Sequence, residues 1–363
     1  MKILIDILHP AHVHLFKNLI NELKGKGNSP LITVKGIPAA KELLGLYNIP
    51  YIEIGSKSDT IKGKFVNQFK YDLKLRKIVN DNKIDLAIGS SITIAHVSKI
   101  SKTKSIVLDD DDDEVQPLMV KYGHPFADLI LSPDVLKGKR KKKETIYYSG
   151  YHELAYLHPK RFTPDKSVLN QAGISEGEKY FVLRFNSFKA HHDIGEQGLS
   201  IENKRKIVKI LSEYGKVFIT TERTIDPEFE QYRISIPPHE IHSFISYSTM
   251  LIGDSQTMTS EAAVLGVPSI RSNSFVGRIS YLEEEEHKYG LTFGFKPNES
   301  EKLFIKLKEL LTNPNLKEEW KEKRKKLLED KIDVTAFLFW FVEYYPESVK
   351  MMKEKPDYQN RFI

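Results

Sequence analysis

The residues that most clearly suggest chemistry lie in the segment 251–271, where an apolar run ends at Gly253 and an Ala/Leu-rich stretch continues to Gly266. This order is typical of a strand, a tight turn, a helix with a glycine cap and a further strand. Backbone N–H groups at such a helix start, with the positive end of the helix dipole, bind phosphate or another anion. Glu261, one turn into the helix, could accept hydrogen bonds from a sugar or ribose diol, and a Glu at such a position is rarely part of a core. An ordinary strand–helix unit with a hydroxyl cap is the alternative. The candidate residues of the turn are Ser255, Gln256, Thr257, Met258 and Thr259.

Three histidines, His9, His12 and His14, follow the first apolar run of the chain. Imidazole suits a general base because its unperturbed pKa of about 6.5 leaves it largely neutral at pH 7. We favour His14 over His12 as the base because it lies nearer the helix start, and roles in capping or substrate contact are the alternative. The spacing does not place all three on one helix face, so a three-histidine metal site is not expected.

Six consecutive acids, Asp109 to Glu114, follow another expected strand. A solvated acidic loop is the commonest explanation of such a run. Asp109 and Asp110 lie closest to the strand end, where they could orient an acceptor hydroxyl or act as the base themselves. A divalent cation bound by the carboxylate oxygens is a further alternative.

Several basic side chains also follow expected strands. The guanidinium group of Arg184 could stabilise a leaving phosphate, because it matches phosphate oxygens bidentately, and a structural ion pair is the alternative. The further candidates are Asn186, Lys189, His191, His192, Arg223, Arg271 and Arg278.

The elements that must position these residues alternate between short apolar runs and amphipathic stretches, which indicates βα units and parallel sheets. We therefore predict an α/β fold with two Rossmann-like domains, 1–160 and 161–333, whose strand ends face a cleft between them. Residues 146–150 are expected to begin the crossover between the halves. The aromatic segment 334–345 is predicted to be a helix, and residues 334–363 are expected to pack back on the N-terminal domain. The expected strands are 2–8, 31–34, 51–54, 85–89, 105–108, 180–184, 216–220, 249–252 and 268–271.

Composition limits the classes of function. The chain has 363 residues, 40% hydrophobic content and no cysteine, so it can form two full cores but no disulfide or thiolate metal site. It shows neither a signal peptide nor an apolar tract near the roughly 20 residues that span a bilayer, so we expect a cytoplasmic protein. The net charge of +6 suits phosphorylated ligands or a weak peripheral contact with anionic lipid. Nucleic acid binding is not expected, because the densest basic run, 137–143, lacks interleaved aromatics and is interpreted as a solvated connection.

Four motifs carry a resemblance to a known superfamily. They are His9-Pro-Ala-His-Val-His14, Pro125-Phe-Ala-Asp128, Gly150-Tyr-His-Glu153 and Thr257-Met-Thr-Ser-Glu-Ala-Ala263. The chain resembles the GT-B glycosyltransferases and UDP-N-acetylglucosamine 2-epimerases, and within that superfamily an uncharacterised prokaryotic family. The resemblance covers most of residues 1–345. It implies that the small-residue turn holds a diphosphate, Glu261 a ribose, and the His239 segment a nucleobase, while the N-terminal domain faces the acceptor. It also implies that basic groups and a helix dipole replace a metal, so no cofactor is expected.

The leading hypothesis is a glycosyltransferase that uses a nucleotide-diphospho-sugar, UDP-linked, to build a surface polysaccharide or glycolipid on a saccharide or lipid-linked acceptor. A sugar-nucleotide epimerase is the first alternative. The epimerases carry Gly-Asp-Thr where this chain has Gly89-Ser90-Ser91, so an essential acid is missing unless the acidic run supplies it. A non-catalytic nucleotide-sugar-binding protein is the second alternative.

Overall fold

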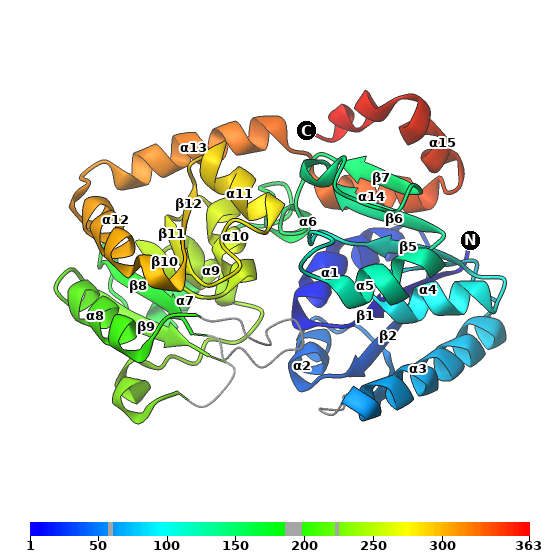
Figure 1. The fold of residues 1–363 in the computed structure, drawn as a ribbon, viewed down its shortest axis with the longest axis horizontal. Coiled ribbons are helices and arrows are strands. Elements are labelled where there is room, and N and C mark those ends of the chain that lie inside the picture. Colours follow the sequence, from blue (N-terminus) through cyan, green and yellow to red (C-terminus); the bar gives the residue numbers. More distant parts are fainter. Residues whose placement is uncertain (57–60, 186–197, 222–224) are drawn as a thin grey trace. The chain divides into compact units, whose positions relative to one another are not determined.

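The computed structural model describes residues 1–56, 61–185, 198–221 and 225–363. The chain forms two compact units. The N-terminal unit comprises residues 1–161 together with 331–363, and the C-terminal unit comprises residues 162–330. In each unit helices lie on both faces of a parallel sheet (Figure 1).

The sheet of the N-terminal unit has seven strands in the order β3-β2-β1-β4-β5-β6-β7, all paired in parallel. The strand order reverses between β1 and β4, because β2 and β3 follow on one side of β1 and β4 to β7 on the other. At this point Asp6 of β1 lies opposite Gly89 of β4. The central strands are continuous apolar runs because both of their faces are buried, as expected in a parallel sheet. The strands are β1 (Ile3–Ile7), β2 (Leu31–Gly36), β3 (Ile52–Ser56), β4 (Leu86–Gly89), β5 (Lys104–Leu108), β6 (Leu129–Pro133) and β7 (Thr145–Tyr148).

Helices of this unit come from both ends of the chain. The C-terminal α14 packs on α1 and α6, and Thr335 at its start donates a 2.6 Å hydrogen bond to the carbonyl of Ala155. The side chain of Asp333 caps α14 by accepting from the N–H of Ala336. The helices are α1 (Pro10–Gly25), α2 (Pro38–Leu46), α3 (Ile61–Asn82), α4 (Ile92–Lys99), α5 (Pro117–Tyr122), α6 (Leu154–Leu157), α14 (Val334–Glu343) and α15 (Glu347–Glu354).

The sheet of the C-terminal unit has five parallel strands in the order β12-β11-β10-β8-β9, with its own reversal between β8 and β10. The strands are β8 (Tyr180–Arg184), β9 (Lys216–Thr220), β10 (Met250–Gly253), β11 (Ser269–Ser272) and β12 (Thr292–Phe295). The helices are α7 (Ser167–Gln171), α8 (Ile201–Ser212), α9 (Ile241–Ser246), α10 (Gln256–Leu265), α11 (Ser280–His287), α12 (Ser300–Thr312) and α13 (Leu316–Asp330).

Three parts of the fold differ from the sequence-based expectation. Residues 145–148 do not begin a crossover but form β7, an edge strand whose residues alternate between half-buried and buried. Helix α11 and strand β12 were not predicted, because α11 is rich in glutamate and β12 is mostly half-buried and contains a glycine. Helix α15 likewise lies beyond the last predicted element.

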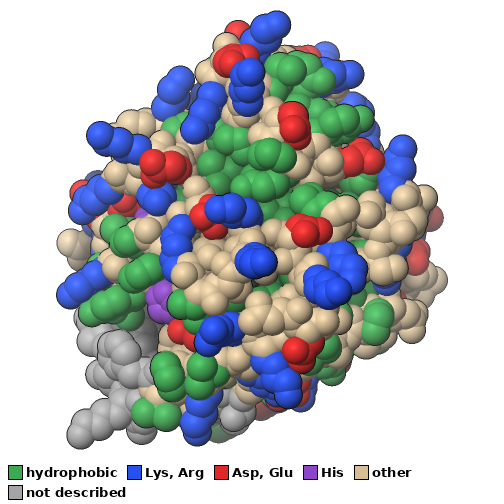
Figure 2. Space-filling model, turned by 90° about the vertical axis from the view of Figure 1, so that its right-hand side faces the viewer, with side chains coloured by type: hydrophobic (Ala, Val, Ile, Leu, Met, Phe, Trp, Pro, Cys, Tyr) green, Lys and Arg blue, Asp and Glu red, His purple; other side chains and the backbone are tan. Residues whose placement is uncertain are grey.

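Charged side chains of both signs alternate over the face of the molecule drawn in Figure 2, with hydrophobic side chains between them. Within the part of the chain that the structure describes, no helix has the length and apolar character needed to cross a membrane.

Candidate functional site

The carboxyl ends of β1 and β4 lie close together at the point where the strand order of the N-terminal unit reverses. A Cβ on Gly89 would lie 2.6 Å from the carbonyl oxygen of Asp6, so only glycine fits there. The buried Asp6 carboxylate accepts hydrogen bonds from Thr33 at 2.6 Å and from Ser91 at 2.5 Å. Ser91 in turn caps α4. Asp6 therefore ties β1, β2 and the start of α4 together at the carboxyl edge of the sheet, where ligands bind in such folds.

The histidine loop follows β1 at this edge. His9 caps α1, and His12 accepts a 3.4 Å hydrogen bond at Nδ1 from the N–H of Leu8. Burial lowers the pKa of His12 to about 3, and the charges of His9 and His152 lower it further, against the opposing charge of Asp110. The ring is therefore neutral at pH 7 with its hydrogen on Nε2. Such a ring can donate a hydrogen bond but is a poor base.

His14 lies elsewhere on α1. Its buried ring stacks on Tyr156 at 5.5 Å, and its Nδ1 lies 3.3 Å from the hydroxyl of Tyr47. The structure thus holds His14 between α1, α2 and α6, among aromatic rings. Both of these contacts are with aromatic side chains.

Asp109, the first acid of the run, belongs to a buried network. Its Oδ2 lies 2.6 Å from His124 Nε2, and Gln116 donates to its Oδ1. Arg140 donates to the backbone oxygen of Asp109 at 2.6 Å and to Asp113 at 2.8 Å. Burial raises the pKa of Asp109, but the hydrogen bond to His124 and the charge of Arg140 together hold it below its usual range. Asp109 is therefore an internal ion-pair partner that positions the loop.

Asp110, the next acid, faces a different histidine. Its Oδ2 lies 2.9 Å from Nδ1 of His152, which is 8% exposed. Burial raises the pKa of Asp110, but the charge of His152 and the hydrogen bond to it lower the pKa below its ordinary value. Among the described residues, buried His152 Nε2 and Tyr148 Oη have no hydrogen-bond partner. Asp110 thus orients the ring of His152 through one nitrogen, while the other nitrogen is buried and has no partner among the described residues.

Asp111 contrasts with its two neighbours. Burial raises its pKa well above the ordinary value, and the negative charges of Asp110 and Asp109 raise it further. Both causes favour the protonated form of the half-buried Asp111 side chain.

The turn between β10 and α10 has the geometry of an anion site. A Cβ on Gly253 would lie 2.1 Å from the carbonyl oxygen of Arg184, so the turn requires glycine. Ser255 caps α10 by accepting from the N–H of Met258 at 3.3 Å. No hydrogen bond joins the backbone N–H of Gln256 or Thr257 to another described residue. These groups are the unpaired donors of a helix start and can bind phosphate.

The rest of α10 is less accessible than expected. Thr259 is fully buried and bonds to the carbonyl of Ser255 at 2.6 Å. Glu261 is 5% exposed, and its Oε1 lies 2.9 Å from Nε2 of His242 on α9. The expectation that Glu261 lies outside the core is therefore wrong, because α10 is packed between β10 and α9.

The remaining basic candidates lie in different environments. Arg271 is fully buried, and its Nη2 lies 2.7 Å from Glu283 and 3.4 Å from Glu286. Glu283, Glu286 and His287 offer ligand atoms within 4.8 Å of one another, but the guanidinium bonded to both carboxylates favours an ion-pair cluster over a cation site. Arg184 is half-buried at the end of β8.

Arg278 is exposed, with its guanidinium 5.2 Å from the centre of the Phe275 ring. His239 is half-buried beside Glu240, at 3.7 Å. Asn186, Lys189, His191, His192 and Arg223 lie outside the described residues.

Sequence reasoning missed His152, His124 and Arg140 as members of the buried cluster. The Gly150-Tyr-His-Glu153 motif was the available signal for His152. Arg140 lies in the basic run that was interpreted as a solvated connection, yet its side chain is fully buried between carboxylates. For this residue the solvated interpretation is wrong.

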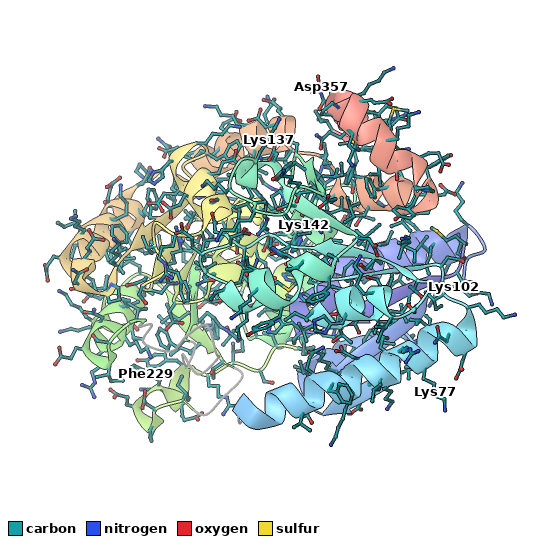
Figure 3. The ribbon with its side chains drawn as sticks, turned by 45° about the vertical axis from the view of Figure 1, so that its right-hand side comes forward. Lys77, Lys102, Lys137, Lys142, Phe229 and Asp357 are labelled. Atoms are coloured by element: carbon teal, nitrogen blue, oxygen red, sulfur yellow. The ribbon has the colours of Figure 1, made fainter. Side chains whose placement is uncertain are left out.

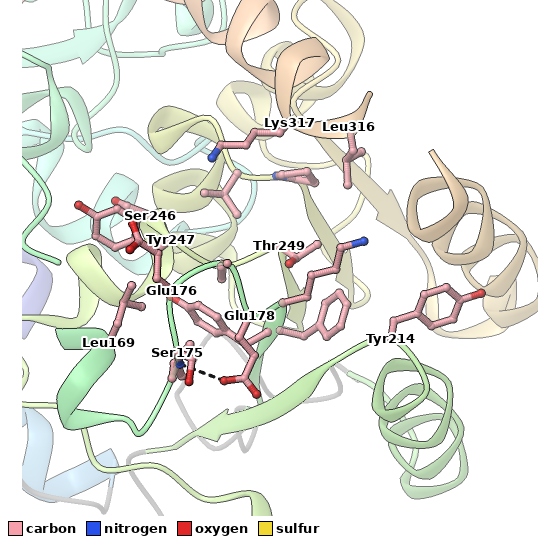
Figure 4. Close-up of a pocket in the computed structure, with 18 of the residues that line it drawn as sticks. Leu169, Ser175, Glu176, Glu178, Tyr214, Ser246, Tyr247, Thr249, Leu316 and Lys317 are labelled. Atoms are coloured by element: carbon pink, nitrogen blue, oxygen red, sulfur yellow. Dashed lines mark hydrogen bonds between the residues drawn. The ribbon is translucent and has the colours of Figure 1, made fainter. Parts of the chain in front are cut away.

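A hollow of about 890 Å³ lies at the amino ends of the strands of the C-terminal sheet (Figure 4). It is lined by residues that precede strands, including Lys179, Thr249 and Pro268. The dashed line in Figure 4 marks the 3.0 Å bond from the N–H of Ser175 to Glu178. Because it adjoins the amino ends of β8, β10 and β11, the hollow is distinct from the anion-type turn at their carboxyl ends.

A family model described as "Protein of unknown function (DUF354)" matches residues 1–287. The chain belongs to this family. An uncharacterised protein of Methanocaldococcus jannaschii is 25% identical over 300 residues, which are 78% of this chain and 85% of the relative. The resemblance to an uncharacterised prokaryotic family is confirmed.

Solved structures resemble this DUF354 chain along most of its length. The UDP-N-acetylglucosamine 2-epimerase of Neisseria meningitidis, bound to its UDP-sugar, matches with a TM-score of 0.62 at 14% identity, covering 91% of this chain and 95% of the epimerase. Spinosyn forosaminyltransferase matches with a TM-score of 0.65 at 12% identity, covering 96% and 99%. At these identities the likeness shows the fold, which is GT-B-like as predicted.

Proposed function

We propose that this DUF354 protein is a glycosyltransferase that uses a nucleotide-diphospho-sugar. The observation that carries the proposal is the Asp110–His152 pair. Oδ2 of Asp110 lies 2.9 Å from Nδ1 of His152. The other ring nitrogen of His152, Nε2, is buried and has no hydrogen-bond partner in the part of the chain that the structure describes. An imidazole oriented by a carboxylate in this way is suited to remove a proton from a hydroxyl group. The unpaired N–H groups at the start of α10 support a diphosphate-binding role for the C-terminal unit.

The proposed reaction assigns one role to each group. The acceptor hydroxyl oxygen forms a bond to the anomeric carbon of the donor sugar, and the bond from that carbon to the diphosphate oxygen breaks. His152 Nε2 takes the hydroxyl proton, and the Asp110 carboxylate stabilises the imidazolium that forms. Neutral His12 donates a hydrogen bond to a substrate oxygen. The start of α10 stabilises the negative charge of the leaving nucleoside diphosphate.

The donor and acceptor classes follow from the same proposal. One structural neighbour is bound to UDP-N-acetylglucosamine and another is a forosaminyltransferase, which supports a sugar nucleotide as donor, with UDP as the expected nucleotide and uracil as its base. We propose a saccharide or lipid-linked acceptor and a role in surface polysaccharide or glycolipid synthesis. A cytoplasmic location, where sugar nucleotides are available, remains a prediction.

Isothermal titration calorimetry against UDP, GDP, CMP and their sugars tests the donor site. Binding of one nucleotide series, followed by transfer to an acceptor panel, is the expected result. If no nucleotide binds at millimolar concentration, the proposal is refuted. Binding without turnover on any acceptor would instead indicate a non-catalytic nucleotide-sugar-binding protein.

A sugar-nucleotide epimerase is the second candidate, and the similarity of the fold to solved UDP-N-acetylglucosamine 2-epimerases favours it. Asp111, whose pKa is raised, is the acid of the run that could protonate a sugar carbon or a leaving oxygen. Incubation with UDP-N-acetylglucosamine alone separates the two candidates. Formation of the 2-epimer, or release of UDP with N-acetylmannosamine, would identify an epimerase.

A further inference from the structure

The outer face of α3 carries large apolar side chains in water. Val66, Phe69 and Leu73 are 54%, 65% and 47% exposed. Their spacing of three and four residues places them on one side of the helix as a continuous stripe. Single exposed apolar residues are common, but three neighbours on one helix face indicate an interaction surface.

Basic side chains flank this stripe on both sides. At 100° per residue, Lys70, Lys74 and Lys77 lie along one side and Arg76 along the other. All four are exposed, and none has an ion-pair partner among the described residues. Lys77 extends from α3 away from the sheet (Figure 3).

Between residues 66 and 77, all of which the structure describes, the one acid is Asp72. It is turned away from the stripe, since its Oδ2 lies 2.8 Å from His96 Nδ1 on α4. The outer face of this segment therefore carries basic and apolar side chains and no acid.

The inner face of α3 fixes this orientation. Tyr71, Leu75 and Val79 are buried, and Leu75 and Val79 belong to the core cluster beneath the helix. Gln68 donates a 3.0 Å hydrogen bond to Thr93 on α4. The helix cannot rotate to bury the outer stripe without breaking these contacts.

We propose that the outer face of α3, comprising Val66, Phe69, Lys70, Leu73, Lys74, Arg76 and Lys77, docks on an anionic lipid surface. A helix with aromatic and aliphatic side chains bordered by lysine and arginine lies in the plane of a membrane interface, with its apolar side chains in the acyl boundary and its cations at the headgroups. A second copy of the chain fits this face less well, because a twofold contact would bring the four cations of each copy together. The inference does not depend on the proposed transferase activity.

Co-sedimentation of the full chain with vesicles tests the proposal. We expect binding to vesicles of phosphatidylcholine with phosphatidylserine, weak binding to phosphatidylcholine alone, and a decrease with added salt. The double variant Phe69→Ser/Leu73→Ser should lower the partition coefficient at least about tenfold, because two large apolar side chains no longer enter the bilayer. Lys70→Glu/Lys74→Glu should lower it by at least about 25-fold, since each lost cation contributed about fivefold and the new carboxylates are repelled by the anionic surface.

Matched variants on the C-terminal unit serve as controls. Ile305, 67% exposed on α12, provides Ile305→Ser, and exposed Lys308 and Lys326 provide Lys308→Glu/Lys326→Glu with the same change in net charge. Both controls should bind as the unaltered chain does. Thermal melting of every variant verifies folding.

Two outcomes would overturn the proposal. The first is absence of binding to phosphatidylserine vesicles, or equal losses in the α3 variants and the controls. The second is a dimer, detected by light scattering, that the Phe69→Ser/Leu73→Ser variant converts to monomer without any vesicle binding. That result would assign the face to self-association.

Discussion

Replacing His152 with asparagine is the most direct perturbation of the proposed base. The Asn amide lies near the position of Nδ1 and can still donate to Asp110, so the half-buried carboxylate keeps a partner, while the ring nitrogen Nε2 is lost. Loss of a general base lowers a rate by about 10²–10⁴-fold, or about 2.7–5.5 kcal/mol of barrier. Transfer should fall by that amount, and nucleotide affinity should stay unchanged because the proposed donor site belongs to the C-terminal unit.

Asp110→Asn tests the orienting group. The 2.9 Å contact joins the buried ring of His152 to the half-buried carboxylate of Asp110, and hydrogen bonds to charged groups contribute about 1.5–3 kcal/mol. If that stabilisation acts on the imidazolium of the transition state, the rate falls about 10- to 150-fold. The double variant should be no slower than His152→Asn alone, because without the imidazole the carboxylate has nothing to orient.

His96 provides a matched control for both variants. Its Nδ1 lies 2.8 Å from Asp72, but its Nε2 is already bonded to the carbonyl of Tyr122 at 2.7 Å. His96→Asn should therefore leave the transfer rate unchanged. Single-turnover assays with a bound sugar nucleotide would measure all these rates. Full activity of a folded His152→Asn protein would refute the reasoning, and loss of transfer in His14→Ala instead would return the base to the histidine favoured by the sequence.

Two further predictions concern the donor site and the histidine loop. Glu261→Ala should weaken nucleotide binding by about 1.5–3 kcal/mol, measured by calorimetry. It should also lower the free energy of unfolding by about 1–3 kcal/mol, because His242 loses its hydrogen-bond acceptor. A variant with unchanged affinity would exclude Glu261 from the donor site. His12 has a folded pKa of about 3, below the unfolded value of about 6.5, so the unfolded chain binds more protons between these values. The free energy of unfolding therefore keeps its full value above pH 6.5 and decreases as the pH falls, by about 2 kcal/mol at pH 5. Urea denaturation at pH 7 and pH 5 measures this difference, and His12→Asn should remove the part that His12 contributes. An equal pH dependence in that variant would contradict the lowered pKa.

The strand and helix pattern could be predicted from the sequence because it depends on local periodicity. Strands buried on both faces, such as β1 and β8, are unbroken apolar runs, and their neighbours show helical spacing. The glycine turn before α10 was predictable for the same reason, since the Gly253 and Gly266 signals lie within one strand–helix unit. Weak local signals were missed: β7 is short and half-buried, and α11 is dominated by glutamate.

The sequence by itself thus determined the fold class, the two halves and the loops at strand ends where polar residues gather. Only the tertiary structure decided which side chains meet. Asp109 and Asp110 are adjacent in the chain, yet one bonds to His124 with Arg140 and the other to His152. Their directions depend on how the β5 loop crosses the loops after β6 and β7. The burial of charged side chains was also decided by the tertiary structure. Local sequence patterns predict that Glu261 and Arg140 are exposed to water. Both are buried because the packing of distant segments brings them their partners, His242 and Asp113.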